Sequence, residues 1–280
     1  MIIDAHCHLN AAQLSDNWHN HIRDFVGQEG KGLSIIGTEQ EDSKHAVALM
    51  TQIISDYPSL FVGATIGIHP EYAEQHQDTT NLEQAICDLE ELYAHHKQHI
   101  IGIGEIGTDL HREQYVPHHT TQKTLFRAQC ELARKLDLPI IIHSRDDFAG
   151  TLDVVKDFVD LKIYYHCWGY GPQELQVLQN TIPHDHLRIG FCGNITYPKA
   201  QELRDSFQYC LDHDVHILLE TDSPYLAAQA IRGTTNTPAQ IIYTYDYIAQ
   251  HFGISIDTLK KHVYNNFMKL YFPHATITGT

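Results

Sequence analysis

The sequence predicts an α/β fold in which a single (β/α)8 TIM barrel spans residues 1–280 and carries an extra C-terminal helix. Eight short apolar or β-branched runs alternate with longer amphipathic segments, and this alternation favours a parallel barrel over a doubly wound sheet. A chain of 280 residues has the length that such barrels commonly take as one domain. Neither a linker nor a repeat divides the sequence.

The expected strands are the apolar runs at 2–8, 33–38, 60–68, 100–106, 139–143, 162–167, 187–193 and 216–222. Helical patterns cover 39–57, 81–97, 118–136 and 198–213, each long enough to cross back over a sheet. The stretch 255–272 is expected to form the extra helix on the outside of the barrel.

The composition is acidic, with 19 Lys plus Arg against 35 Asp plus Glu and a formal net charge of −16. Such a surface repels nucleic acids and anionic membranes at long range, so an anionic substrate must be drawn in locally. The six cysteines show no C-x-x-C spacing and are expected to be free thiols in a reducing cytoplasm. The first residues show neither a basic n-region nor a long h-region, and no run of 18 or more apolar residues occurs, so we expect a soluble protein that is not exported. We expect a cytoplasmic monomer without an obligate protein partner or a membrane association.

A His-x-His pair near the start of the chain is the first chemical signal. If 2–8 is a strand, His6 and His8 project to one face, whereas Ala5 and Cys7 project to the other. Two imidazoles on one face form half of a metal site, although a hydrogen-bonded core pair is about as common. Histidine occurs 22 times, so position at a strand end must distinguish ligands from residues such as His184 in polar, solvated stretches.

Six ionisable residues fall at the carboxyl ends of the expected strands: His6, His8, Glu105, His143, His166 and Asp222. In a (β/α)8 barrel these ends converge on the active face. Separate explanations exist, namely a structural ion pair for Glu105, satisfied core histidines, or a turn or N-cap role for Asp222. The shared position at strand ends favours one common site.

Six ligands exceed the need of one tetrahedral cation, so we expect two divalent cations that share a carboxylate. Glu105 is expected to bridge them. The remaining ligands divide into His6, His8 and Asp222 for one cation and His143 and His166 for the other. Mixed imidazole and carboxylate ligands suit Zn²⁺, Mn²⁺, Co²⁺ or Fe²⁺ better than an all-oxygen Mg²⁺ site, and the sequence alone does not choose among Zn, Mn and Mg.

The chain resembles the TatD-type deoxyribonucleases, a branch of the amidohydrolase-like superfamily. The matching motifs are DAHCH (4–8), GIHP (67–70), GEIG (104–107), LPIIIHSR (138–145), YHC (165–167), LETDSPY (219–225) and the late Asn265. This resemblance implies a (β/α)8 fold, two divalent metals on the ligands named above, and metal-dependent hydrolysis of DNA phosphodiester bonds, often from a 3′ end. Single-stranded DNA or DNA 3′ ends are therefore the expected substrate.

Further residues are assigned roles around this site. Asp222 is expected to act as the general base, and Glu220 either orients a ligand or the water, or forms a buried ion pair. Arg145 and His69 are placed to contact the substrate phosphate, although Arg145 could instead pair with a neighbouring aspartate.

Two aromatic residues follow His166 in the sequence. Trp168 and Tyr170 could stack on a base or simply cover the mouth of the barrel.

Three segments depart from the family pattern: GTDLH (107–111), WGYG (168–171) and TNTP (235–238). They leave all six ligands intact and affect the pocket rim, so they leave the substrate open. The first alternative is a hydrolase of a small ester, amide or lactone, including an aminoacyl ester, at the same binuclear site. The second is a non-catalytic protein that binds metal or phosphate.

Overall fold

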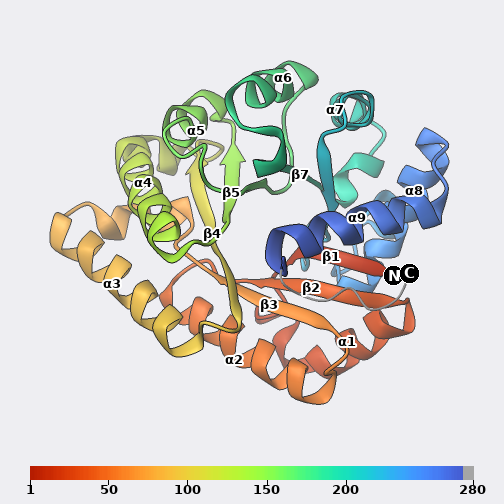
Figure 1. Ribbon diagram of the computed structural model, residues 1–280, viewed down its shortest axis with the longest axis horizontal. Coiled ribbons are helices and arrows are strands. Elements are labelled where there is room, and N and C mark those ends of the chain that lie inside the picture. The colour runs from red at the N-terminus through yellow and green to blue at the C-terminus, as the bar shows by residue number, and fades with distance from the viewer. Residues whose placement is uncertain (274–280) are drawn as a thin grey trace.

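A computed structural model describes residues 1–273 and contains one eight-stranded parallel sheet in the order β1 to β8. Each strand pairs with the next along the chain, and helices cover the outside of the sheet (Figure 1). The predicted (β/α)8 barrel is therefore confirmed, together with the extra C-terminal helix, α9. No helix of these residues combines the length and the apolar character that a bilayer crossing requires.

The strands are β1 Ile2–Cys7, β2 Gly30–Ile36, β3 Phe61–Ile66, β4 Ile100–Asp109, β5 Ile140–Arg145, β6 Ile163–Tyr165, β7 Leu187–Phe191 and β8 His216–Leu219. Most match the expected runs within a few residues. The expected ends were too late for β1, β6 and β8, so His8, His166 and Asp222 lie on the loops that follow. The expected end was too early for β4, because its ladder with β5 continues to the pair of Asp109 and Arg145.

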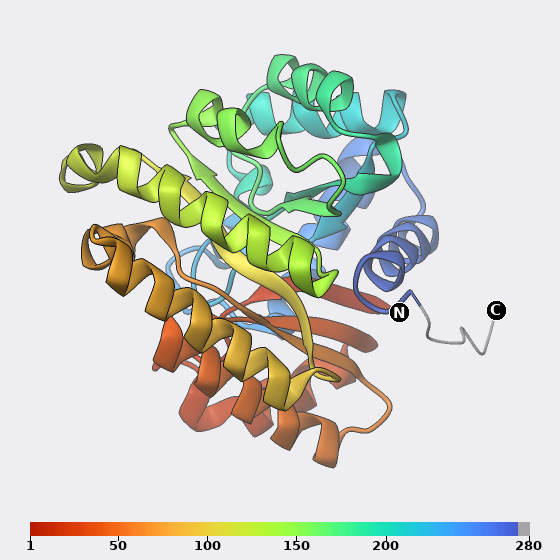
Figure 2. The same cartoon turned by 60° about the vertical axis from the view of Figure 1, so that its left-hand side comes forward.

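The α-helices are α1 Trp18–Gly27, α2 Gln40–Asp56, α3 Thr79–His96, α4 His119–Leu136, α5 Phe148–Val155, α6 Pro172–Thr181, α7 Gln201–Asp212, α8 Ile242–Phe252 and α9 Ile256–Tyr271. Short 3-10 helices are η1 Ser15–Asn17, η2 Pro70–His76, η3 Glu113–His118, η4 His184–His186, η5 Gly193–Thr196, η6 Gln229–Ile231 and η7 Pro238–Ile241. Figure 2 shows the long helices α3 and α4 side by side on the outer surface.

The strands are apolar on both faces because one face fills the barrel and the other supports helices. Every residue of β1 and β4 is buried. The helices α2, α3, α5 and α9 begin at side-chain caps; for example, Glu39 accepts a hydrogen bond from the backbone N–H of Asp42, and Ser255 accepts one from that of Thr258. These caps satisfy orphan donors of the first turn. The carboxyl ends of the strands are thus held on a rigid, packed frame.

The barrel closes between the loop after β8 and the end of β1. The backbone N–H of Asp222 donates to the carbonyl of His6 at 3.0 Å, and the N–H of His8 donates to the carbonyl of Ser223 at 2.8 Å. The first contact joins two predicted metal ligands through the main chain, and the second joins His8 to the residue that follows Asp222. Closure of the barrel and assembly of the site therefore use the same residues.

A buried aspartate, two residues before His6 on β1, supports this closure. The Asp4 carboxyl accepts hydrogen bonds from the Thr221 N–H at 2.8 Å and from its hydroxyl at 2.7 Å. Burial raises the pKa of Asp4 to about 8, against the opposing effect of these hydrogen bonds. Outside, α9 packs on β1 and β8, and Asn266 donates to the Ile217 carbonyl at 2.9 Å.

Candidate metal centre

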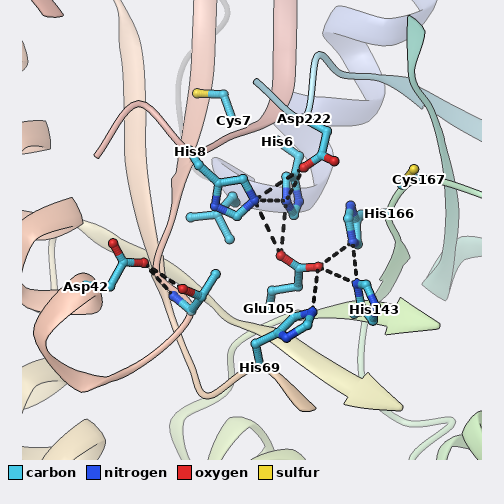
Figure 3. Close-up of polar contacts among 12 residues, drawn as sticks. His6, Cys7, His8, Asp42, His69, Glu105, His143, His166, Cys167 and Asp222 are labelled. Carbon is cyan, nitrogen blue, oxygen red and sulfur yellow. Dashed lines mark hydrogen bonds and ion pairs between the residues drawn. The ribbon is translucent and has the colours of Figure 1, made fainter. Parts of the chain in front are cut away.

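The six predicted ligands converge around one buried carboxylate, that of Glu105 (Figure 3). They come from the ends of β1, β4, β5, β6 and β8, as expected from the convergence of parallel strands at the carboxyl end of a barrel. Glu105 is only 4% exposed. A carboxylate at this depth is stable only with strong partners, and its partners are the surrounding imidazoles.

The two carboxylate oxygens of Glu105 face different imidazoles. Oε1 lies 2.6 Å from His143 Nδ1 and 2.7 Å from His166 Nε2. Oε2 lies 3.5 Å from both His6 Nε2 and His8 Nε2. Burial opposes ionisation, but His166 and the hydrogen bonds from the imidazoles hold the pKa of Glu105 well below its usual value. An ionised carboxylate therefore stands between two pairs of histidines, which is the arrangement that a bridging ligand needs.

The first group of ligand atoms consists of His6, His8 and Asp222. The two Nε2 atoms lie 3.3 Å apart, and Asp222 Oδ1 lies 3.6 Å from that of His6 and 3.3 Å from that of His8. Ligand bonds of about 2.0–2.2 Å in a tetrahedral site place neighbouring ligand atoms roughly 3.3–3.5 Å apart. The spacing of these nitrogen and oxygen atoms thus fits a single cation.

At the first group of ligand atoms, protonation of His8 would compete with the binding of a cation. Burial lowers the pKa of His8, but Asp222 and Glu105 outweigh this effect and raise it to about 8. A cation at this position would therefore displace a proton from His8, because a metal ligand must be the neutral imidazole.

The second group contains two residues in addition to the predicted His143 and His166. His69 Nε2 lies 3.7 Å from Glu105 Oε1, and its ring meets that of His143 edge-on at 4.3 Å between centroids. Asp109 Oδ2 lies 3.1 Å from His143 Nε2. His69, Asp109 and His143 form a further set of potential ligands. His69, expected to contact substrate, thus lies among the potential ligands.

Sequence reasoning missed Asp109, which is 4% exposed. Burial opposes its ionisation, but His143 holds the pKa of Asp109 below its usual value. A signal existed in the sequence, because Asp109 lies four residues after Glu105 and two-residue periodicity puts both side chains on one face of β4. The departure of the segment 107–111 from the family pattern instead predicts a place at the pocket rim.

Behind the second group lies Glu220, which is fully buried. Its carboxylate accepts hydrogen bonds from the Cys167 N–H at 2.5 Å, from Cys192 Sγ at 2.9 Å and from the Tyr164 hydroxyl. Glu220 Oε1 also lies 3.6 Å from His166 Nδ1, the ring nitrogen that faces away from Glu105. A carboxylate in this position can fix the tautomer and the orientation of a ligating imidazole.

The two cysteines next to ligands turn away from the ligand cluster (Figure 3). Cys7 Sγ contacts the Ser34 carbonyl at 3.4 Å.

Hydrogen bonds to Asp42 connect two loops around the ligand cluster. Asp42 accepts hydrogen bonds from the N–H and hydroxyl of Thr38 at 2.9 Å each and from Asn10 at 2.7 Å. Asp42 therefore joins the loops that follow β1 and β2, a role that no sequence pattern predicts.

Around the mouth of the barrel, Arg145 is exposed. The aspartates expected to compete for it have other partners, His111 for Asp146 at 2.8 Å and His119 for Asp147 at 2.7 Å. Within residues 1–273 no ion pair of Arg145 is found. Its guanidinium is thus available to a ligand.

The aromatic residues after His166 pack rather than face the mouth. Trp168 is 2% exposed and contacts Tyr165 and Tyr170 edge-on, and the Tyr170 hydroxyl bonds to Ser144 Oγ at 2.8 Å. Of the two alternatives for Trp168, base stacking is thus wrong, because the loop folds the indole inward. The exposed aromatic beside the ligands is Tyr225, 54% exposed and 6.1 Å from the His8 ring.

Comparison with known proteins places this geometry in context. The model of the family "TatD related DNase" matches residues 3–272. A Mycoplasma pneumoniae protein described as an uncharacterized metal-dependent hydrolase is 29% identical over 275 residues, covering 96% of this chain and 98% of its own. The Bacillus subtilis hydrolase YabD, described in the same way, is 28% identical over 252 residues, with 89% and 91% coverage.

Solved structures show the same fold. The Escherichia coli TatD homologue YjjV superposes with a TM-score of 0.81 at 23% identity, covering 96% of this chain and 97% of that one. A TatD family hydrolase from Entamoeba histolytica gives a TM-score of 0.78 at 21% identity, with coverage of 97% and 98%.

Proposed function

The chain belongs to the TatD related DNase family, and from this premise we propose that it is a metal-dependent hydrolase that cleaves DNA phosphodiester bonds, removing nucleotides from 3′ ends. The observation that carries the proposal is the position of Glu105, whose two oxygens face separate pairs of imidazoles. Two cations that share one carboxylate are the arrangement used for in-line displacement at phosphorus.

The residues present fit two divalent cations. His6, His8 and Asp222 would hold one, with ligand atoms 3.3–3.6 Å apart. His143 and His166 would hold the other, assisted by Asp109 or His69. Such cations supply Lewis acidity at the phosphoryl oxygen and lower the pKa of water toward neutrality. The mixture of nitrogen and oxygen donors favours Zn²⁺ or Mn²⁺ over Mg²⁺.

The chain's own acid–base group is Asp222. Its Oδ1 faces His6 and His8, which leaves Oδ2 free to take a proton from the attacking water and to return it to the leaving oxygen. The backbone fixes this carboxylate, since the Asp222 N–H is bonded to the His6 carbonyl and the Asp222 carbonyl accepts from the Tyr225 N–H at 2.9 Å.

The substrate would be recognised over a short length. Arg145 offers a guanidinium for a phosphate, and Tyr225 offers an exposed ring for a terminal base beside His8. The chain carries a net charge of −16, so a long phosphate track on its surface would be repelled. Attack at a strand end, where few phosphates approach the protein, meets this constraint.

The test uses protein stripped of metal and then titrated with Mn²⁺, Zn²⁺ or Mg²⁺ against a single-stranded oligonucleotide labelled at its 3′ end. We expect metal-dependent release of labelled mononucleotides, with loss of at least 10³-fold in the rate for Glu105→Gln, because one interaction of this kind contributes several kcal/mol. The matched control is Glu83→Gln, an exposed glutamate on α3, which should leave the rate unchanged.

Two results would count against the proposal. If the oligonucleotide stays intact while the protein binds metal and hydrolyses a small ester, amide or lactone, the substrate class is wrong. If metal binds and none of these substrates is turned over, the protein is a binder without catalysis.

A further inference from the structure

A second group of histidine and aspartate side chains lies at the opposite end of the barrel from the candidate metal centre. His184 and Asp185 belong to η4, which precedes β7, and His216 is the first residue of β8. Asp222, by contrast, follows the carboxyl end of β8. The group joins two segments that are about 30 residues apart in the sequence, and its ligand atoms all lie within 4.8 Å of one another.

Both imidazoles face the same carboxylate oxygen. Asp185 Oδ1 lies 3.5 Å from His184 Nδ1 and 3.6 Å from His216 Nε2. These separations exceed the 2.7–3.2 Å that is typical of an N–H···O hydrogen bond. They match the 3.3–3.6 Å spacing of the His6, His8 and Asp222 atoms at the candidate metal centre, which fits ligands around a single cation.

A backbone contact fixes the tautomer of His184. Its Nε2 lies 2.7 Å from the carbonyl oxygen of Asp214. A carbonyl only accepts hydrogen bonds, so Nε2 carries the hydrogen and, in the neutral ring, the lone pair is on Nδ1. That lone pair faces the Asp185 carboxylate, an arrangement that a proton or a cation between the two atoms would stabilise. Imidazoles that bind metals commonly donate their second N–H to a carbonyl in this way.

We propose that His184, Asp185 and His216 form a third divalent-metal site, separate from the candidate metal centre, which takes a borderline cation such as Zn²⁺, Co²⁺, Ni²⁺ or Cu²⁺. Two imidazoles and one carboxylate are donors that such cations prefer over Mg²⁺ or Ca²⁺. This inference does not depend on the proposed nuclease activity.

Hydrogen bonding and packing hold the side chains of His184 and His216 in place before a cation binds. The His216 side chain is 14% exposed at the start of β8, and its ring lies 4.5 Å from that of His184. Arg188 on β7 donates to the Asp185 carbonyl and so holds the backbone of η4 in place. The Asp185 side chain is 91% exposed, so water can complete the coordination.

A cation here would link the segment before β7 to the start of β8. In (β/α)8 barrels the amino-terminal end of the strands serves stability, whereas the carboxyl-terminal end serves catalysis. A ligand that binds only the folded chain stabilises it by mass action. The expected role is therefore a structural clamp, with no part in turnover.

The competing explanation is an ion pair in which a protonated histidine faces Asp185, without any metal. The two accounts differ in stoichiometry. Metal-free full-length protein is titrated with Zn²⁺ by calorimetry, and bound zinc is counted after desalting. We expect the wild type to bind one more equivalent of Zn²⁺ than the His184→Asn, His216→Asn double variant. The matched control, His45→Asn, removes an exposed histidine on α2 and should retain the wild-type stoichiometry.

A second measurement needs only the wild-type protein and so does not depend on the folding of the variant. Long-range ¹H–¹⁵N spectra should show His184 Nδ1 and His216 Nε2 shifting together as one equivalent of Zn²⁺ is added. Oligonucleotide hydrolysis by the double variant should equal that of the wild type, so the absence of a nuclease would not affect this result. Equal stoichiometry in wild type and double variant, or imidazole signals that do not respond to Zn²⁺, would overturn the third site and leave an ion pair.

Discussion

Replacing Glu220 with glutamine tests whether the buried carboxylate behind His166 controls metal binding. The side chain keeps its size, but the charge is lost. At Oε1 the carboxylate accepts from the Cys167 N–H and from Cys192 Sγ, and it lies 3.6 Å from His166 Nδ1. A glutamine carbonyl in the same position still accepts these hydrogen bonds, but as a neutral group. The glutamine NH₂ group then meets the Tyr164 hydroxyl, which can rotate to accept a hydrogen bond from it.

The expected loss follows from these contacts. Hydrogen bonds to a charged group contribute about 1.5–3 kcal/mol, against about 0.5–1.5 kcal/mol for neutral pairs. A carboxylate that supports a ligating imidazole raises its basicity, and removing such a partner typically lowers metal affinity 10- to 100-fold. We therefore expect Glu220→Gln to weaken one Zn²⁺ equivalent by this factor, equivalent to about 1.4–2.8 kcal/mol, while the other equivalents keep their affinity.

The assay is competition for Zn²⁺ against a chromophoric chelator, with metal-free wild type and variant compared at the same pH. Glu83→Gln on the outer surface is the matched control. Far-UV circular dichroism of the variant checks that the barrel remains folded. An unchanged affinity at every equivalent would refute the reasoning, because it would mean that Glu220 is simply a buried ion-pair partner. A loss at all equivalents alike would also contradict a specific effect on His166.

Three further predictions concern other parts of the chain. Burial raises the folded-state pKa of Asp4 to about 8, whereas the unfolded value is about 3.9. Between these two pH values the folded chain binds one proton more than the unfolded chain. The contribution of Asp4 to the free energy of unfolding therefore falls as pH rises from about 4 to 8. Asp4→Asn should remove that slope, measured as the difference in urea midpoints between wild type and variant at several pH values; parallel midpoints would contradict it. If oligonucleotides are hydrolysed, Arg145→Gln should raise KM about 10-fold with kcat nearly unchanged, whereas Arg127→Gln on α4 should have no effect; a fall in kcat alone would argue against phosphate binding. Likewise, Tyr225→Ala should raise KM about 5- to 10-fold through lost base stacking, with Tyr243→Ala, an exposed tyrosine on α8, as control; equal KM values would exclude a stacking role.

The fold and the convergence of the six candidate ligands could be predicted because they depend largely on strand periodicity. Alternation places His6 and His8 on one face, and the parallel register between β4 and β5, in which Gly107 pairs with His143, brings His143 to Glu105. His8 lies one residue past the end of β1, and its side chain keeps the direction that the strand predicts. The sequence was therefore sufficient where strand geometry alone determines the direction of a side chain.

The remaining features depend on contacts between distant segments. The burial of Trp168 results from the path of the loop after β6, and the contact of Asp109 with His143 results from the extension of β4 beyond its expected end. The sequence alone predicts a solvated His184, because its proximity to His216 arises only when the segment before β7 and the start of β8 lie side by side. No local pattern encodes such a contact.

The missed Asp109 changes how the site and the acidic surface fit together. Two divalent cations less the charges of Glu105 and Asp222 would leave a local charge of about +2, and counting Asp109 reduces it to about +1. Physiological salt screens the remaining acidic surface beyond about 8 Å. The site can thus attract one phosphate without attracting a long polyanion. If the substrate is a nucleic acid, its selection is then expected to depend on neutral and aromatic groups at the mouth, such as the exposed Tyr225.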